Sequence, residues 1–63
     1  MLDYQQRVAD ECQELIEKIS KLNAFIETEK FKELPLDEQV RMRMQEWYMN
    51  AYAKVLESRI DQF

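Results

Sequence analysis

Two stripes of apolar residues lie on either side of the chain's only proline, Pro35. The first stripe has alternating spacings of four and three residues: Val8, Cys12, Leu15, Ile19, Leu22 and Ile26. This is the heptad spacing of helices that pack at a shallow angle. The second stripe, after the proline, contains Met42, Met49, Tyr52, Leu56 and Phe63, flanked by Met44, Trp47, Tyr48, Val55 and Ile60. The sequence therefore predicts an all-α fold: a two-helix antiparallel hairpin with a short connecting turn.

The expected hairpin is a single domain over residues 1–63, with a first helix at about 3–27, a connector at 28–34 and a second helix at about 36–61. Asp3 is the predicted N-cap of the first helix, since its carboxylate can accept hydrogen bonds from free amides. Thr28 is expected to cap one short turn that carries Phe31, which would tuck back under the hairpin. Pro35 suits the start of the second helix, where its missing N–H costs nothing.

The second helix has more apolar surface than one partner helix can cover. Its predicted seam consists of Met42, Gln45, Met49, Tyr52, Leu56, Arg59 and Phe63. A second row lies beside this seam and contains Met44, Tyr48, Ala51 and Val55, with Trp47 further round. Exposed apolar patches of this kind mark interfaces. Chains this short usually need further stabilisation by a disulfide, a metal or oligomerisation. We therefore expect a homo-oligomer, with interface residues Met42, Met49, Tyr52, Leu56, Phe63, Trp47 and Tyr48.

Composition excludes several classes of protein. Nine Lys and Arg against thirteen Asp and Glu give a net charge of −4, which argues against DNA as a partner. The chain has no glycine, so it cannot form a glycine-rich phosphate-binding loop. It also has no histidine, the residue most often used in general acid–base catalysis. Its single cysteine, Cys12, cannot form an intrachain disulfide or a structural zinc site. No secretion signal and no membrane span are expected. The expectation is a cytosolic binding protein that is not an enzyme and needs neither cofactor nor metal.

Arg59 and Gln45 are polar residues on the predicted apolar seam of the second helix. In one interpretation, Arg59 extends its charged group out of the interface or pairs with Glu27 or Asp61. In the other, Arg59 lies at a junction between subunits. At such a junction symmetry would repeat its guanidinium and create an anion site suited to phosphate. Gln45 either sets the packing register or contacts a base edge.

A loose strip of aromatic and basic residues follows the first helix: Tyr4, Arg7, Lys18 and Lys21. The two lysines lie four residues after Glu14 and Glu17, so they could simply form helix-surface ion pairs. Alternatively, an aromatic ring beside cationic groups can hold a stacked base and its phosphate.

Residues spread over nearly the whole chain, from Tyr4 to Ile60, resemble a family of small phage proteins. These are the hairpin-domain sponges that act against the CBASS and Thoeris defences. The resemblance is carried by Tyr4, Arg7, Val8, Glu11, Leu15, Lys18, Ile19, Leu22, Phe25, Ile26, Phe31, Leu34, Gln45, Met49, Tyr52, Leu56, Arg59 and Ile60.

The resemblance implies a helical hairpin that assembles into hexamers in the host cytoplasm. It implies sequestration, without cleavage, of cyclic dinucleotides, cyclic trinucleotides or cyclic ADP-ribose isomers. Leu56 and Arg59 match the family's Leu-x-x-Arg pattern, which implies that Arg59 lines a cyclic trinucleotide site at a three-fold junction. Tyr4 with Lys18 or Lys21 would correspond to the dinucleotide site. The alternative is a helical module that inhibits a host protein through Trp47, Tyr48 and the methionines.

Overall fold

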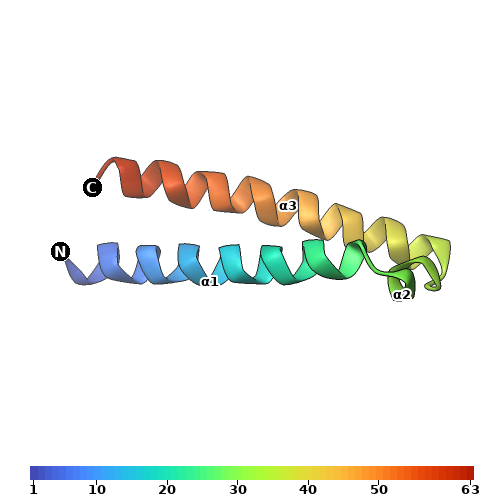
Figure 1. Ribbon diagram of the computed structural model, residues 1–63. Coiled ribbons are helices and arrows are strands. Elements are labelled where there is room, and N and C mark those ends of the chain that lie inside the picture. The colour runs from blue at the N-terminus through green and yellow to red at the C-terminus, as the bar shows by residue number, and fades with distance from the viewer.

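The computed structural model describes residues 1–63 and contains three helices, α1 (Asp3–Ile26), α2 (Glu29–Lys32) and α3 (Leu36–Asp61). The long helices α1 and α3 lie side by side and antiparallel, and α2 lies at the reversal between them (Figure 1). Both termini lie at the opposite, open end of a rod that measures 46 × 14 × 13 Å. The prediction of an all-helical hairpin with a short connection is confirmed. None of the helices combines the length and the apolar content that a membrane span requires.

The first helix begins with a different cap from the one that the sequence suggested. Leu2 is the N-cap residue, and its backbone N–H donates to Oε1 of Gln5 at 3.0 Å. Asp3 lies inside the first turn, so the prediction that it caps α1 is wrong. Its carboxylate still lies near the positive end of the helix dipole, which favours negative charge there.

Thr28 organises the reversal, as predicted. Its Oγ1 accepts from the backbone N–H of Phe31 at 3.3 Å and donates to the carbonyl of Phe25 at 2.6 Å. The Phe31 ring is only 2% exposed and meets the ring of Phe25 edge to face, with centroids 6.2 Å apart. The short helix α2 therefore serves to hold one aromatic side chain under the end of the hairpin.

The return into α3 is made without any residue at positive φ. Pro35 precedes α3 in an extended conformation, with φ −53° and ψ 145°. The side-chain amide of Gln39 donates to the carbonyls of Leu34 at 2.9 Å and Lys32 at 3.2 Å. Gln39, in the first turn of α3, thus satisfies two backbone carbonyls of the reversal.

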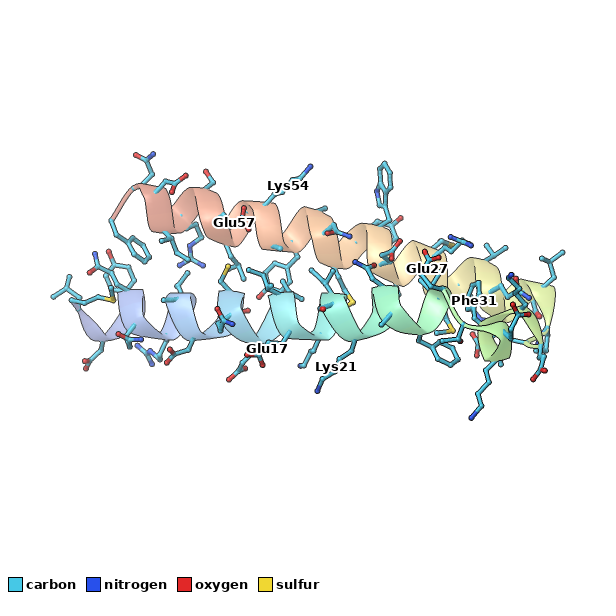
Figure 2. All side chains as sticks on the ribbon, in the orientation of Figure 1. Glu17, Lys21, Glu27, Phe31, Lys54 and Glu57 are labelled. Carbon is cyan, nitrogen blue, oxygen red and sulfur yellow. The ribbon has the colours of Figure 1, made fainter.

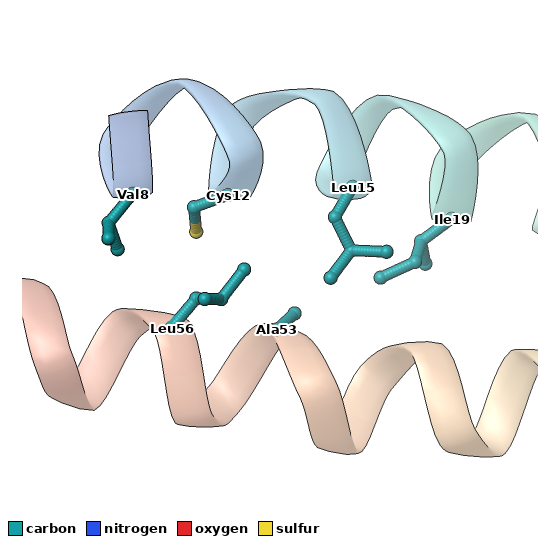
Figure 3. Close-up of a cluster of buried hydrophobic side chains, with 6 residues drawn as sticks. All are labelled: Val8, Cys12, Leu15, Ile19, Ala53 and Leu56. Atoms are coloured by element: carbon teal, nitrogen blue, oxygen red, sulfur yellow. The ribbon is translucent and has the colours of Figure 1, made fainter. Parts of the chain in front are cut away.

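The core lies between α1 and α3. Its buried members are Val8, Cys12, Leu15, Ile19, Ala53 and Leu56 (Figure 3). Met49 and Ile60 pack against this cluster, and Leu56 is 1% exposed. No polar or charged residue is buried.

The seam of α3 differs from the predicted one at alternate positions. The buried or half-buried residues in the middle and C-terminal parts of α3 are Met42, Glu46, Met49, Ala53, Leu56 and Ile60. The predicted seam is therefore wrong at Gln45, Tyr52 and Arg59, all three of which are exposed. Ala53 takes the central place because its small side chain leaves room for the branched side chains of Leu15 and Ile19 across the seam (Figure 3).

Candidate functional site

The side of α3 that points away from α1 carries a second row of apolar residues, all of them exposed. We call it the outer face, and its members are Val40, Met44, Trp47, Tyr48, Ala51 and Val55. Trp47 is the most exposed of its large side chains, at 73%. Apart from the adjacent pair Trp47 and Tyr48, their spacing of three and four residues matches that of the buried seam on the other side of the helix. α3 is thus apolar on two opposite sides, and α1 covers only one of them.

Trp47 separates two grooves on this surface. One groove, of about 420 Å³, is lined by Arg43, Glu46, Trp47, Asn50, Ala51 and Lys54. The other, of about 310 Å³, is lined by Val40, Arg43, Met44, Trp47 and Tyr48. Four of the six residues that line the first groove are polar or charged, and the indole of Trp47 forms one wall, so we call it the Trp47 groove. The second is almost entirely apolar.

The two cations of the Trp47 groove have no carboxylate partner. The ion pairs of the chain join Lys32 to Glu29, and Arg41 to Asp37 and Glu38. The guanidinium carbon of Arg43 instead lies 5.2 Å from the centroid of the Phe31 ring, a cation–π arrangement. Lys54 projects away from α1 (Figure 2). Both cationic groups therefore keep their donors available for an anion.

Asn50 completes the polar wall of the Trp47 groove. Its side-chain nitrogen donates to the carbonyl of Glu46 at 2.9 Å, which orients the amide along the helix. The one carboxylate of the groove, Glu46, is half-buried on the side of α3 that meets α1. The groove thus combines an aromatic platform, one amide and a net positive charge.

The predicted ligand-binding residues lie in different parts of the hairpin and do not form one site within a single chain. The rings of Tyr4 and Phe63 meet edge to face at the open end, and the antiparallel arrangement puts Arg7 and Arg59 at this same end. Arg59 is exposed and makes no ion pair. Glu27 follows the end of α1 at the reversal, so a pair between Arg59 and Glu27 is ruled out within one chain.

Lys18 and Lys21 lie further along α1. Lys18 lies fourteen positions after Tyr4, which is about 21 Å at ~1.5 Å per residue. Neither lysine forms the expected ion pair, and Glu17 accepts a hydrogen bond from Gln13 at 3.2 Å instead. A single chain therefore does not bring the aromatic and basic strip into one pocket.

Gln45 is also exposed, and its amide lies 3.8 Å from the sulfur of Met49. It is neither in the core nor beside the residues of the open end.

Sequence reasoning missed Arg43, Asn50 and Lys54 as site candidates. The available signal was their spacing with Trp47: positions 43, 47, 50 and 54 follow the four-and-three rhythm of one helix flank. The net negative charge of the chain hid this local excess of positive charge.

The chain is similar to known proteins over nearly its whole length. A family model described as Sequestin matches residues 2–62. An uncharacterized 7.5 kDa protein from the denB-rIIB intergenic region of Enterobacteria phage T4 is 43% identical over 63 residues, covering 100% of this chain and 98% of that protein. No solved structure matches the chain.

Proposed function

The chain belongs to the Sequestin family, and from this premise we propose that it sequesters a cyclic oligonucleotide immune signal of the host without cleaving it. The observation that carries the proposal is the Trp47 groove, in which two cations without ion pairs flank an exposed indole ring. The family's name, which denotes sequestering, and the phage T4 relative support the same reading.

The groove offers the two kinds of contact that a nucleotide needs. An exposed aromatic ring can stack on a base, which contributes about 1–3 kcal/mol per base by alanine substitution. A guanidinium presents a planar fork that matches two phosphate oxygens. Binding alone blocks a signal, so the proposed activity requires no acid, base or nucleophile and no cofactor.

Homo-oligomerisation is part of the proposal. A helix that is apolar on both sides is normally buried on both sides, and the outer face of α3 has no partner within the chain. The resemblance to hexameric sponges suggests a hexamer as the assembled state. Where subunits meet, the exposed residues Tyr4, Arg7, Lys18, Lys21, Gln45 and Arg59 would add further ligand contacts.

Calorimetry tests the proposal directly. The protein is titrated with cyclic dinucleotides, cyclic trinucleotides and a cyclic ADP-ribose isomer, with linear dinucleotides as a control. We expect saturable binding of at least one cyclic ligand and its recovery, chemically unchanged, after the protein is denatured. Absence of binding across the series would overturn sequestration, and recovery of a linear product would overturn binding without cleavage.

The second candidate is a module that inhibits a host protein. It is favoured by the exposure of Trp47, Tyr48 and Met44, because aromatic and methionine side chains dominate protein-binding hot spots. This function predicts a stoichiometric complex with one host protein that Trp47→Ala abolishes. Persistence of that complex in the presence of saturating cyclic nucleotide would separate it from the sequestering function.

A further inference from the structure

The apolar positions of the outer face of α3 are symmetric along the helix, although the residues that occupy them differ. Val40 lies seven residues before Trp47, and Val55 lies seven residues after Tyr48. Met44 lies three residues before Trp47, and Ala51 lies three residues after Tyr48. The row is therefore symmetric about the point between Trp47 and Tyr48, which is the requirement for a surface that binds itself across a two-fold axis.

We propose that a second copy of the chain covers the outer face of α3, with the two α3 helices antiparallel about that midpoint. In this pairing Val40 lies opposite the partner's Val55, and Trp47 lies opposite the partner's Tyr48. The long side chain of Met44 lies opposite the small one of the partner's Ala51, which allows close approach of the helices. Every apolar member of the face thereby meets an apolar residue.

The pattern of apolar residues on α3 favours a second copy of the chain over an unrelated partner. α3 carries two seams of the same three-and-four spacing, and packing of the kind found between α1 and α3 would serve on both. The face is self-complementary in register and in apolar character, a property that binding to a different protein does not require. The chain is also short enough that one hairpin core is marginal.

The same pairing completes an anion site. Arg43 and Lys54 lie on one flank of α3, because they line the same groove. In a two-fold antiparallel pair each flank meets the same flank of the partner. The register places Arg43 about two residues, or ~3 Å along the axis, from the partner's Lys54. Two such sites form, each with a Trp47 ring in its wall.

Neither cation makes an ion pair, and Glu46 offsets only one of the two charges in the groove, so an anion between the cations stabilises the pair. This step rests on the proposed function, since the anion would be a phosphate of the cyclic oligonucleotide. Ligand binding and pairing of the two chains are then coupled, and nucleotide tightens the assembly.

Disulfide trapping tests the register. A double variant, Met44→Cys with Ala51→Cys, is expected to form a covalent dimer on mild oxidation, whereas each single variant stays monomeric on a denaturing gel. The two positions are about 10 Å apart within one helix, too far for an internal disulfide. Dimers from the Met44→Cys variant alone would show parallel pairing, and failure of the double variant to crosslink would also overturn the inference.

A matched control uses the same spacing on the other helix. Gln13→Cys with Ser20→Cys places two exposed thiols seven residues apart on α1, away from the proposed interface. It is expected not to form covalent dimers under the same conditions. The buried thiol of Cys12 is common to all variants and is tested by the unmodified chain. If the α1 control crosslinks equally, the disulfides form by random collision between chains, and the inference is overturned.

Sedimentation equilibrium tests the coupling with ligand. Ala51→Glu is expected to shift the protein towards its 7.7 kDa monomer with unchanged helix content, whereas Ser20→Glu on exposed α1 surface leaves the assembly intact. With cyclic di-AMP or cyclic tri-AMP as probe, pairing of the unmodified chain should tighten at least tenfold. The Arg43→Gln, Lys54→Gln double variant should still pair without nucleotide but show no tightening.

The outcomes separate the two proposals. If the chain pairs and crosslinks as described but binds none of the cyclic nucleotides, the proposed function fails and the α3 interface stands. If the chain binds nucleotide while it remains a monomer, sequestration stands, whereas homo-oligomerisation and the α3 interface both fail. Tightening that persists in the double variant would overturn the assignment of Arg43 and Lys54 to the anion site.

Discussion

The rings of Tyr4 and Phe63 meet edge to face, with centroids 5.7 Å apart and ring planes at 81°. Tyr4 lies in the first turn of α1, and Phe63 lies two residues beyond the end of α3. The contact therefore fastens the two long helices together at the open end of the hairpin, where no connecting segment does so.

Removal of this contact should loosen the open end. Phe63→Ala is expected to lower the free energy of unfolding by about 1 kcal/mol, since aromatic pairs contribute ~0.5–1.5 kcal/mol beyond their buried area. Urea unfolding at a fixed chain concentration measures the change. Tyr52→Ala is the control, because Tyr52 is exposed to a similar degree as Phe63, 45% against 42%, but pairs with no other ring. Equal losses in both variants would contradict a specific role for the ring pair.

The register of α3 makes Leu56 the most sensitive core position. Leu56→Ala is expected to cost about 2–5 kcal/mol, the range for truncation of a fully buried leucine. A chain of this size has only about 3–9 kcal/mol of stability, so circular dichroism should show substantial loss of helix at room temperature. Leu36→Ala is the same substitution at a residue that is 75% exposed, and it should change stability by less than ~0.5 kcal/mol. Retention of full helix content by the Leu56 variant would refute this seam.

The cap at the reversal can be tested by a pair of substitutions. Thr28→Ala removes the oxygen that accepts from Phe31 N–H and should cost about 1 kcal/mol. Thr28→Ser keeps the hydroxyl and should recover most of this loss. Thermal unfolding measures both, because 1 kcal/mol corresponds to a shift of roughly 4–8 °C for a domain of this size. Equal melting temperatures for the two variants would show that the hydroxyl is not the stabilising group.

Arg59 offers a test of ligand contact that is free of folding effects. Its side chain is exposed and outside the seam, so Arg59→Gln should leave the free energy of unfolding within ~0.5 kcal/mol. If Arg59 contacts a cyclic trinucleotide as proposed, calorimetry should show at least a tenfold loss of affinity, about 1.4 kcal/mol. Arg41→Gln is the control, because Arg41 is already engaged by Asp37 and Glu38. Unchanged affinity in the Arg59 variant would remove this residue from the site.

The sequence predicted the hairpin because α1 has one unambiguous apolar stripe. Of its six members, Val8, Cys12, Leu15, Ile19 and Ile26 are buried and Leu22 is half-buried. The Thr28 cap and the burial of Phe31 were also predictable, since a capping residue three positions before an aromatic one is a local pattern.

The register of α3 could not be predicted in the same way. Two seams pass through Met42, Met49 and Leu56, and both have three-and-four spacing. The alternatives differ only by one position between these shared residues, and the predicted one contained the larger side chain of Tyr52 where the structure uses Ala53. The choice depends on the volume that Leu15 and Ile19 occupy across the interface, which the pattern of a single helix does not contain.

The residues predicted to form one ligand site on α1 lie apart because sequence proximity on a helix does not give spatial proximity. Tyr4 and Lys18 share one helix and hence one strip in the sequence, but a straight helix keeps them about 21 Å apart. Arg43 and Lys54 were overlooked because the apolar residues between them suggested an interface and nothing else.

The reversal at α2 has a consequence for the order in which the chain folds. Its hydrogen bonds join residues close in sequence: Thr28 to Phe31, and Gln39 to Leu34 and Lys32. Closing such short segments costs little chain entropy and takes place early. Packing of the two long helices can then proceed from this end towards Tyr4 and Phe63, which are the contacting residues farthest apart in the sequence. The termini should accordingly be the last part of the hairpin to form and the first to exchange their amide protons.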